Sequence, residues 1–159
     1  TLIFTRTRHG ARKLTRIIRD MDHSVAEIHS NRSLLQRKEA MAGFKSGKYR
    51  ILVATDIASR GIDVTGIELV INYDLPTNTE DYIHRIGRTA RAGVAGHAIS
   101  LATPEQRREL RDIERLIRKT LPISPVPELP PRRQPKFLLK IQPGQRSFRE
   151  QQPKHRSRH

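Results

Sequence analysis

Five short apolar runs, separated by segments with helical features, constrain the fold of this chain more than any other feature of its sequence. They lie at residues 1–4, 25–28, 50–54, 68–72 and 97–101. Because the runs are continuously apolar rather than alternating, we expect both faces of each strand to be covered. Strands that alternate with helices form a parallel sheet with right-handed crossovers. The sequence therefore predicts an α/β fold, an open parallel sheet with helices on both faces.

The segments between the runs carry signals for helix starts and ends. Residues 10–21 place apolar side chains at helical spacing. Residues 33–36 and 103–106 each fit a capping box, in which a hydroxyl side chain and a glutamine satisfy backbone N–H groups reciprocally. Gly47 is expected to end the helix that follows Ser33, in the left-handed conformation. Acidic residues at 79–81 favour the start of a further helix.

The charge divides the chain into two parts. Residues 1–121 contain 22 Lys and Arg against 14 Asp and Glu, and residues 122–159 contain 9 against 2. The second part is also rich in proline and glutamine, which predicts a domain at 1–121 followed by a disordered basic tail at 122–159. The net charge of +15 indicates a polyanionic partner, and nucleic acid is favoured for the domain. The alternative is that the excess charge keeps the chain soluble. For the tail the two interpretations are about even, because a disordered basic segment binds many anions weakly.

Several classes of protein are excluded or disfavoured by composition. The chain has no cysteine, so it has neither disulfides nor cysteine-bound metal, and its histidines show no metal-ligand spacing. No apolar run is long enough to span a membrane and no signal peptide precedes the first strand, so a cytoplasmic protein without a membrane partner is expected. Because the chain begins inside a predicted strand, we expect the domain to lack its first residues.

Candidate ligand-binding loops follow the predicted strands. In open α/β sheets, ligands bind at the carboxyl ends of the strands. The loops at 5–8, 55–63 and 73–76 follow three of the runs and contain hydroxyl, arginine and glycine residues in different combinations. Hydroxyl groups, backbone N–H groups and guanidinium groups suit phosphate oxygens. One such loop is weak evidence, but three at one sheet edge predict a phosphate-binding surface.

Residues 84–93 contain a histidine and three arginines among small residues, without an acid. His84, Arg88 and Arg91 have a spacing that would place them on one face of a helix. A solvated basic face is the ordinary explanation for a single exposed arginine. The small residues around this group allow a close approach, which suits arginines that stabilise a transferred phosphoryl group.

Four stretches in this order resemble the C-terminal RecA-like domain of DEAD-box ATP-dependent RNA helicases, of superfamily 2. Residues 3–7 resemble motif IV, 53–63 motif V, 70–76 motif Va and 84–93 motif VI. The match is most similar to the RhlE-like branch. The resemblance implies a RecA-like sheet and one half of an enzyme that couples ATP hydrolysis to local unwinding of an RNA duplex.

The resemblance also implies residue roles. Arg88 and Arg91 would be arginine fingers on the ATP γ-phosphate. Asp63 would contact the ribose, and His84 and Arg85 would link the domain to the nucleotide and to a partner domain. The RNA backbone would be held, with little sequence preference, by Thr7, Arg37, Thr55 and Gly61, with Arg60 supporting its loop.

Some family elements are changed or missing. Ala90 stands where the family usually has glycine, and Leu34 occupies the glutamine position of a Gln-x-x-Arg element whose arginine is Arg37. The chain contains neither a Walker A loop nor an Asp-Glu-Ala-Asp box. ATP and Mg²⁺ would therefore be bound mainly by an N-terminal RecA-like domain, and this chain alone is expected to be inactive.

Two other functions fit the same residues. A non-enzymatic RNA-binding or annealing module with a basic tail is the main alternative, because the chain lacks the phosphate-binding loop. A DNA helicase of the same superfamily is the second.

Overall fold

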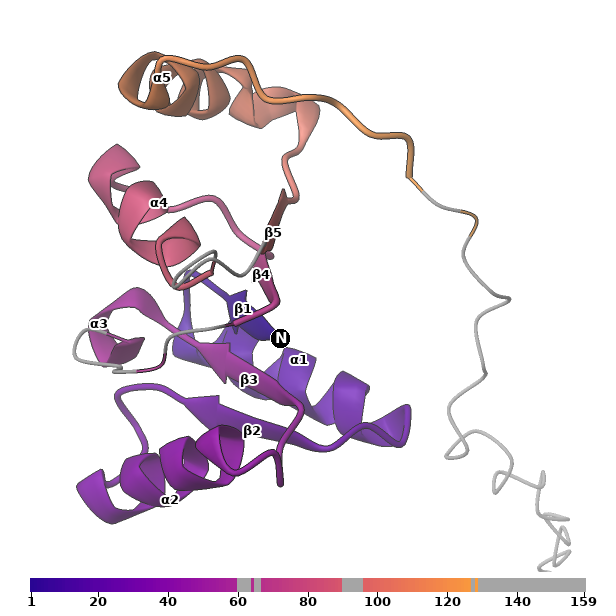
Figure 1. Ribbon diagram of the computed structural model, residues 1–159, viewed down its shortest axis with the longest axis vertical. Helices are drawn as coiled ribbons and strands as arrows, with labels where there is room; N and C mark the ends of the chain where they lie inside the picture. The colour runs from indigo at the N-terminus through magenta and orange to yellow at the C-terminus, as the bar shows by residue number, and fades with distance from the viewer. Residues whose placement is uncertain (60–63, 65–66, 90–95, 127, 129–159) are drawn as a thin grey trace, which may run out of the picture. The chain divides into compact units, whose positions relative to one another are not determined.

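A five-stranded parallel sheet forms the centre of the protein (Figure 1). The computed structural model describes residues 1–59, 64, 67–89, 96–126 and 128. The strands are β1 (Leu2–Phe4), β2 (Val25–Ile28), β3 (Ile51–Ala54), β4 (Leu69–Asn72) and β5 (His97–Ser100), in the order β2-β3-β1-β4-β5. Every neighbouring pair is parallel, so the predicted parallel sheet is confirmed.

Helices connect the strands, as the alternation of patterns predicts. They are α1 (Arg8–Asp20), α2 (Leu34–Lys45), α3 (Asp56–Ser59), α4 (Thr79–Ile86) and α5 (Arg107–Ile117), and a 3₁₀ turn, η1 (Pro104–Gln106), precedes α5. The chain divides into two units, Thr1–Pro122 and Ile123–His159, and the contacts described below lie within the first. None of the helices in the described ranges combines the length and the hydropathy that a membrane span requires.

The helix ends follow the local signals closely. Both bonds of the capping box at Ser33 are present, and Gly47 has a φ of +78° just after α2, as predicted. The box at Thr103 also forms, but it opens the 3₁₀ turn rather than an α-helix. α1 begins before the predicted Gly10, because the Thr7 side chain accepts a hydrogen bond from the Gly10 N–H and caps the helix there.

Two apolar layers lie on opposite faces of the sheet. On one face, Leu2, Phe4 and Leu52 pack with α2 through Ala40. On the other, Ile3 and Val53 pack with α1 through residues such as Ala11 and Ile18. Alternate residues of each strand thus supply the two layers. Helices therefore cover both faces of the three strands at this side of the sheet, which confirms the predicted architecture.

The expectation that every strand is covered on both faces is wrong for β5. His97, Ala98 and Ile99 are exposed, and Ile99 keeps 49% of its surface accessible. β5 is an edge strand, and α1 packs against β2 and β3 at the other side of the sheet. An apolar run indicates that a strand can be buried. The position of the strand in the sheet decides whether a helix covers it.

A third apolar cluster joins the last two helices. Leu75, Tyr82 and Ile113 are buried together, with Ile86 and Ile117 packed against them. This cluster attaches α5 to α4 and fixes α4 against the sheet (Figure 1). Since α4 leads into residues 84–93, the cluster also positions the start of the predicted phosphate-binding stretch.

Candidate functional site

The predicted ligand-binding segments meet at the carboxyl ends of the strands. Residues 5–8 follow β1, residues 55–59 follow β3, and residues 73–76 follow β4. β1 lies between β3 and β4, so the three segments are neighbours although they are far apart in the sequence. The edge also receives the start of α2, because β2 pairs with β3. The sheet therefore brings the predicted loops together at one edge.

Thr7 occupies the start of α1 at this edge. Its Oγ1 accepts a hydrogen bond of 3.0 Å from the Gly10 N–H, and its residue is exposed. A hydroxyl group has one donor and two acceptor lone pairs, so the capping bond leaves the O–H free to donate to an external oxygen. The predicted RNA contact of Thr7 is compatible with its role as a helix cap.

Arg37 connects α2 to the segment after β3. Its Nη2 donates a hydrogen bond of 3.2 Å to the carbonyl of Ala58 in α3, which leaves further N–H groups of the guanidinium able to donate. Thr55 is buried, and its N–H donates to the carbonyl of Ile28 at 3.2 Å. These bonds tie α2, the segment after β3 and the end of β2 together. The contact with RNA that the resemblance implies for Arg37 and Thr55 stays a prediction.

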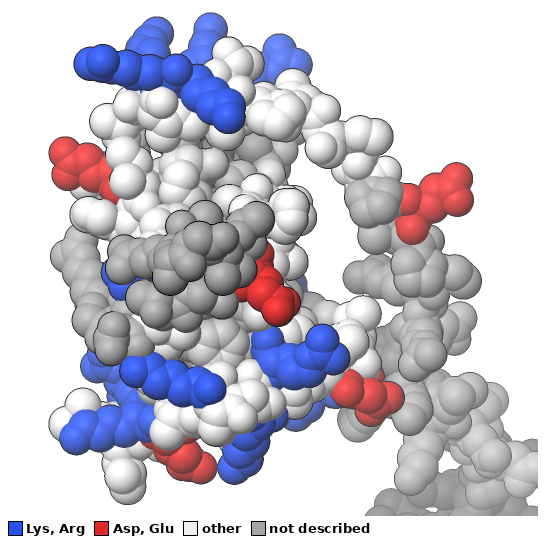
Figure 2. All heavy atoms as spheres, viewed as in Figure 1, with Lys and Arg blue, Asp and Glu red and all other residues white. Residues whose placement is uncertain are grey.

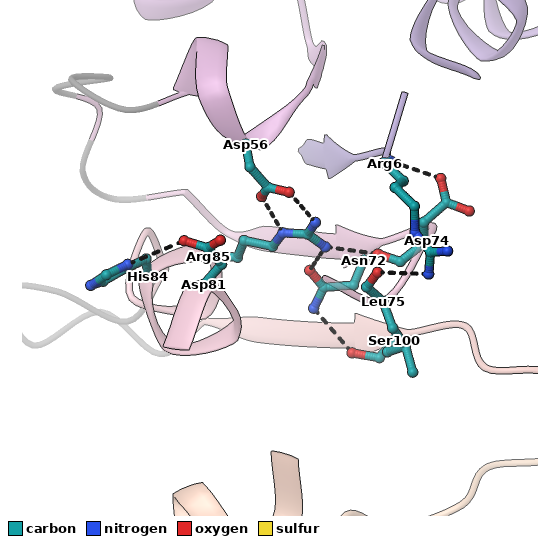
Figure 3. A network of polar contacts seen from close by, with 9 residues as sticks. All are labelled: Arg6, Asp56, Asn72, Asp74, Leu75, Asp81, His84, Arg85 and Ser100. Atoms are coloured by element: carbon teal, nitrogen blue, oxygen red, sulfur yellow. Dashed lines mark hydrogen bonds and ion pairs between the residues drawn. The ribbon is translucent and has the colours of Figure 1, made fainter. Parts of the chain in front are cut away.

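The Arg85 side chain donates four hydrogen bonds at this edge (Figure 3). It is only 2% exposed, and its Nε and Nη2 donate to the two carboxylate oxygens of Asp56 at 2.6 and 2.7 Å. Its Nη1 donates to the Asn72 side chain at 3.0 Å and to the Asp74 carbonyl at 2.7 Å. The guanidinium also lies over the Phe4 ring, 5.0 Å from its centre. One arginine therefore joins the ends of β1, β3, β4 and α4.

These contacts give Arg85 a structural role inside the domain that was not predicted from the sequence. Its expected link to a partner domain stays a prediction. Asp56, Asn72 and Asp74 were not singled out as a group either. The sequence signal that could have predicted this network is a polar residue at the end of each of two buried strands. A polar side chain that is buried there needs a hydrogen-bond partner.

A second connection at the edge involves Arg6. Its backbone N–H donates to the Asp74 carboxylate at 2.8 Å, and its Nη2 donates to the Leu75 carbonyl at 3.3 Å (Figure 3). Asp74 therefore contacts Arg6 through its side chain and Arg85 through its carbonyl. The loops after β1 and β4 are held together by both arginines.

The predicted helix face is not formed between His84 and Arg88, because α4 ends at Ile86, and Arg91 lies outside the described residues. Gly87 follows the helix, and a Cβ there would come within 3.0 Å of the Ile83 carbonyl oxygen, so the chain turns at a residue without a side chain. Arg88 lies beyond the helix and is half-buried, whereas His84 is exposed and 3.7 Å from the Asp81 carboxylate. Thr89 then holds the segment after α4 in place, because its hydroxyl donates a hydrogen bond to the Ile67 carbonyl.

Part of the predicted site lies outside the described residues. Asp63, Arg60 and Gly61 belong to the stretch after α3, and Ala90 and Arg91 to the stretch after Thr89. Their roles stay predictions from the family resemblance.

The structure shows the surroundings of Leu34, which stands at the glutamine position of the Gln-x-x-Arg element. Leu34 is the first residue of α2 and is 66% exposed, so it presents an apolar side chain where the family has a glutamine. Gln36 does not substitute for it, because its Oε1 accepts the Ser33 N–H within the capping box at 3.1 Å. The resemblance implies a polar contact with RNA at this position, and the Leu34 side chain has no group that could make it.

His29 organises the loop between β2 and α2. It is 1% exposed, its Nδ1 accepts the Asn31 N–H at 3.2 Å, and its Nε2 lies 3.7 Å from a carboxylate oxygen of Glu27, whose other oxygen pairs with Arg32. Burial lowers the pKa of His29, the Glu27 carboxylate opposes this effect, and the Arg32 and Arg12 charges add to it. The neutral imidazole is therefore the form that the fold holds.

Acid is expected to destabilise the protein through His29. Because the pKa of His29 is lower in the folded than in the unfolded chain, its contribution is constant above about pH 6.5 and stability falls as the pH drops below that value. Protonation would also remove the acceptor for the Asn31 N–H. Thermal unfolding between pH 7.5 and 5.5 checks this: His29→Gln should flatten the decrease in Tm, and the exposed-site control His9→Gln should not. Equal slopes for wild type and His29→Gln would contradict it.

The comparisons with known proteins agree with the fold. The family model described as the helicase conserved C-terminal domain matches residues 1–93. The chain is 45% identical over 128 residues to "DEAD-box ATP-dependent RNA helicase 10" of Arabidopsis thaliana, covering 80% of this chain and 28% of the relative. It is 44% identical over 142 residues to "ATP-dependent RNA helicase DbpA" of Bacillus subtilis, covering 88% of this chain and 30% of the relative.

A solved structure gives the same result in three dimensions. The E. coli DEAD-box protein SrmB, bound to regulator of ribonuclease activity A, superimposes with a TM-score of 0.71 and 35% identity. The match covers 76% of this chain and 71% of that chain. The present chain spans less than a third of the curated relatives named above.

Proposed function

This chain belongs to the helicase conserved C-terminal domain family, in the form found in DEAD-box RNA helicases, and we propose that it supplies half of a composite ATP site together with part of an RNA-binding surface. The complete enzyme would be an ATP-dependent RNA helicase. ATP with Mg²⁺ would be bound mainly by an N-terminal RecA-like domain. Within the family we propose the RhlE-like branch, and we propose the cytoplasm as its location.

The observation that carries this proposal is the set of bonds between segments at the carboxyl edge. Arg37 bonds the Ala58 carbonyl, and Arg85 bonds Asp56 and the Asp74 carbonyl. These bonds hold the start of α2, the segment after β3 and the exit of α4 in one arrangement. A fixed arrangement of donors is what phosphoryl transfer requires of a protein, because catalysis of that reaction rests on positioning and charge stabilisation.

The residues at the edge fit the terminal phosphate of a nucleotide. The exit of α4 is anchored through Thr89 and Arg85, so Arg88 is presented on a supported segment. Arg88 and Arg91 would donate to the γ-phosphate when the two domains close, and Asp63 would contact the ribose. His84, which is exposed, would contact the partner domain. Loss of the γ-phosphate would remove these contacts and allow the domains to part.

The RNA site would lie beside the nucleotide site on the same edge. Thr7 and Arg37 have hydrogen-bond donors that their contacts within the domain leave available. With Thr55, Gly61 and the loop supported by Arg60, they would hold the sugar-phosphate backbone of one strand. Such contacts position RNA without reading its sequence. Closure of the domains would bend the bound strand and separate a short duplex locally.

Removal of the Arg37 side chain tests the RNA site. Arg37→Ala is expected to weaken binding of single-stranded RNA by about ten- to a hundredfold at moderate salt, since a charge-assisted phosphate contact contributes about 1.5–3 kcal/mol. Fluorescence anisotropy with a labelled oligouridylate measures the effect. Lys38→Ala removes an exposed cation from the same helix and serves as the control. Equal affinities of Arg37→Ala and wild type would contradict the proposed site.

The coding sequence upstream of Thr1 tests the two-domain enzyme. A Walker A loop and an Asp-Glu-Ala-Asp box in the same reading frame are expected. A start codon at this point and RNA binding without a complementing domain would instead favour the non-enzymatic RNA module. In a complete enzyme, stimulation of ATP hydrolysis by RNA and not by DNA is expected, and the opposite preference would favour a DNA helicase.

A further inference from the structure

The first helix carries a larger excess of positive charge than α5, another exposed basic helix. α1 contains five Lys and Arg and one acid, whereas α5 contains four Arg and three acids. Figure 2 shows Lys and Arg side chains over α5, but there Arg115 pairs with Asp112 at 3.0 Å. Across the described part of the chain, Arg12, Arg16 and Arg19 of α1 form no ion pair with an acid. The charge of α1 is therefore the less neutralised of the two.

The arginines of α1 form a stripe along the helix. Arg8, Arg12, Arg16 and Arg19 follow one another at intervals of four, four and three residues, so they share one side of α1. All four are exposed, while Ala11, Thr15 and Ile18 face the sheet and are buried. The stripe is about 16 Å long. Since a nucleic-acid strand in a duplex carries one phosphate per about 3.4 Å of helix axis, this length corresponds to about five phosphates.

The stripe begins at the proposed RNA site. Arg8 follows Thr7 directly, and its Nη1 donates to the Asn31 side chain at 2.9 Å. Asn31 lies in the loop that His29 organises and that leads into α2 with Arg37. The first arginine of the stripe is thus held against the edge where the RNA backbone is proposed to bind. α1 then runs away from this edge along the sheet, packed on β2 and β3.

We propose that Arg12, Arg16 and Arg19 bind the phosphate backbone of RNA that extends beyond the proposed RNA site at the carboxyl edge. The inference rests on the proposed function for its starting point at Thr7. Guanidinium groups along one face of a helix suit a phosphate backbone, because each can donate two parallel hydrogen bonds to a phosphate. The stripe would bind flanking RNA regardless of its sequence. It would hold the RNA near the carboxyl edge between rounds of ATP hydrolysis.

A triple variant of the full 159-residue chain tests the stripe. R12Q/R16Q/R19Q removes three exposed charges, and R108Q/R111Q/R115Q on α5 is a control with the same loss of charge. Binding of a short oligouridylate of about 8 nucleotides and a long one of about 20 nucleotides is measured over a range of salt concentrations. For the long RNA, the α1 variant should reduce the slope of log K against log salt by about 2, since each lost phosphate contact contributes about 0.7. The short RNA and the α5 variant should show little change.

The outcomes separate this inference from the proposed function. One outcome is that Arg37→Ala weakens the binding of both RNAs while the α1 variant leaves the salt dependence of long-RNA binding unchanged. In that case the stripe does not bind RNA, and an acidic protein surface becomes the better candidate partner for it. Equal effects of the two triple variants would mean that only the net charge matters and not its position on α1, and this result would also overturn the inference. If Arg37→Ala has no effect on either RNA, the proposed RNA site itself fails. Circular dichroism confirms that each variant is folded.

Discussion

Replacing Arg88 by alanine in the complete enzyme is expected to lower the turnover of RNA-stimulated ATP hydrolysis by about 10³-fold or more. Arg88 lies just beyond α4, half-buried, on a segment that Thr89 and Arg85 anchor to the sheet. A guanidinium fixed in this way stabilises the charge that develops on a transferred phosphoryl group, and a neutral methyl group cannot. Steady-state ATPase assays at saturating RNA measure the effect.

Two further variants make the Arg88 result specific. Arg88→Lys keeps the charge but loses the planar fork of donors, so only a small part of the activity should return. Arg107→Ala removes an exposed arginine at the start of α5 and should leave turnover unchanged. Unchanged turnover in Arg88→Ala, with the domain folded, would exclude Arg88 as an arginine finger.

Loss of the Arg85 side chain is expected to lower the free energy of unfolding by about 3–5 kcal/mol, the range for removing one partner of a buried ion pair. Arg85→Met would leave the Asp56 carboxylate without both of its bonds from the guanidinium, and Asn72 and the Asp74 carbonyl without a donor. Urea unfolding of the full chain measures the change. A decrease below about 1 kcal/mol would contradict the structural role of Arg85.

Substitution of Asp56, the ion-pair partner of Arg85, shows whether the loss of stability comes from a broken bond or from a buried unpaired charge. Asp56 keeps 25% of its side chain exposed, so Asp56→Asn should cost less than Arg85→Met. The double variant should be less destabilising than the sum of the two, because the buried pair is removed together. If Arg85→Met does not fold, Arg85→Lys gives a measurable intermediate, since it keeps the charge and loses the bidentate geometry.

The architecture was predictable because its signals are local. Continuous apolar runs that alternate with helical segments specify a parallel sheet, and the capping residues Ser33 and Gly47 mark the ends of α2 where the structure has them. The loops at the carboxyl edge were predictable for the same reason, since each follows directly from the end of a strand. Local signals were less informative where two helix types compete, as at Thr103, where a capping box opens a 3₁₀ turn.

The geometry of residues 84–89 was not predictable from spacing alone. Helical periodicity would continue through Arg88, but α4 ends at Ile86 because Gly87 turns the chain and Thr89 bonds a carbonyl 22 residues away. Spacing also did not predict the buried bond between Arg85 and Asp56, 29 residues away. The expected link of Arg85 to a partner domain stays a prediction. The spacing of residues on a helix says nothing about the partners that distant segments provide.

The sequence by itself determined the alternation of strands and helices, the parallel sheet, and the edge at which the loops after the strands meet, because each depends on residues within a few positions of one another. The tertiary structure decided which cation is buried and which is exposed. That decision placed Arg85 inside the domain and left Arg12, Arg16 and Arg19 on the surface of α1. The physical reason is that burial of a charge requires partners, and partners come from packing between segments that the sequence keeps apart.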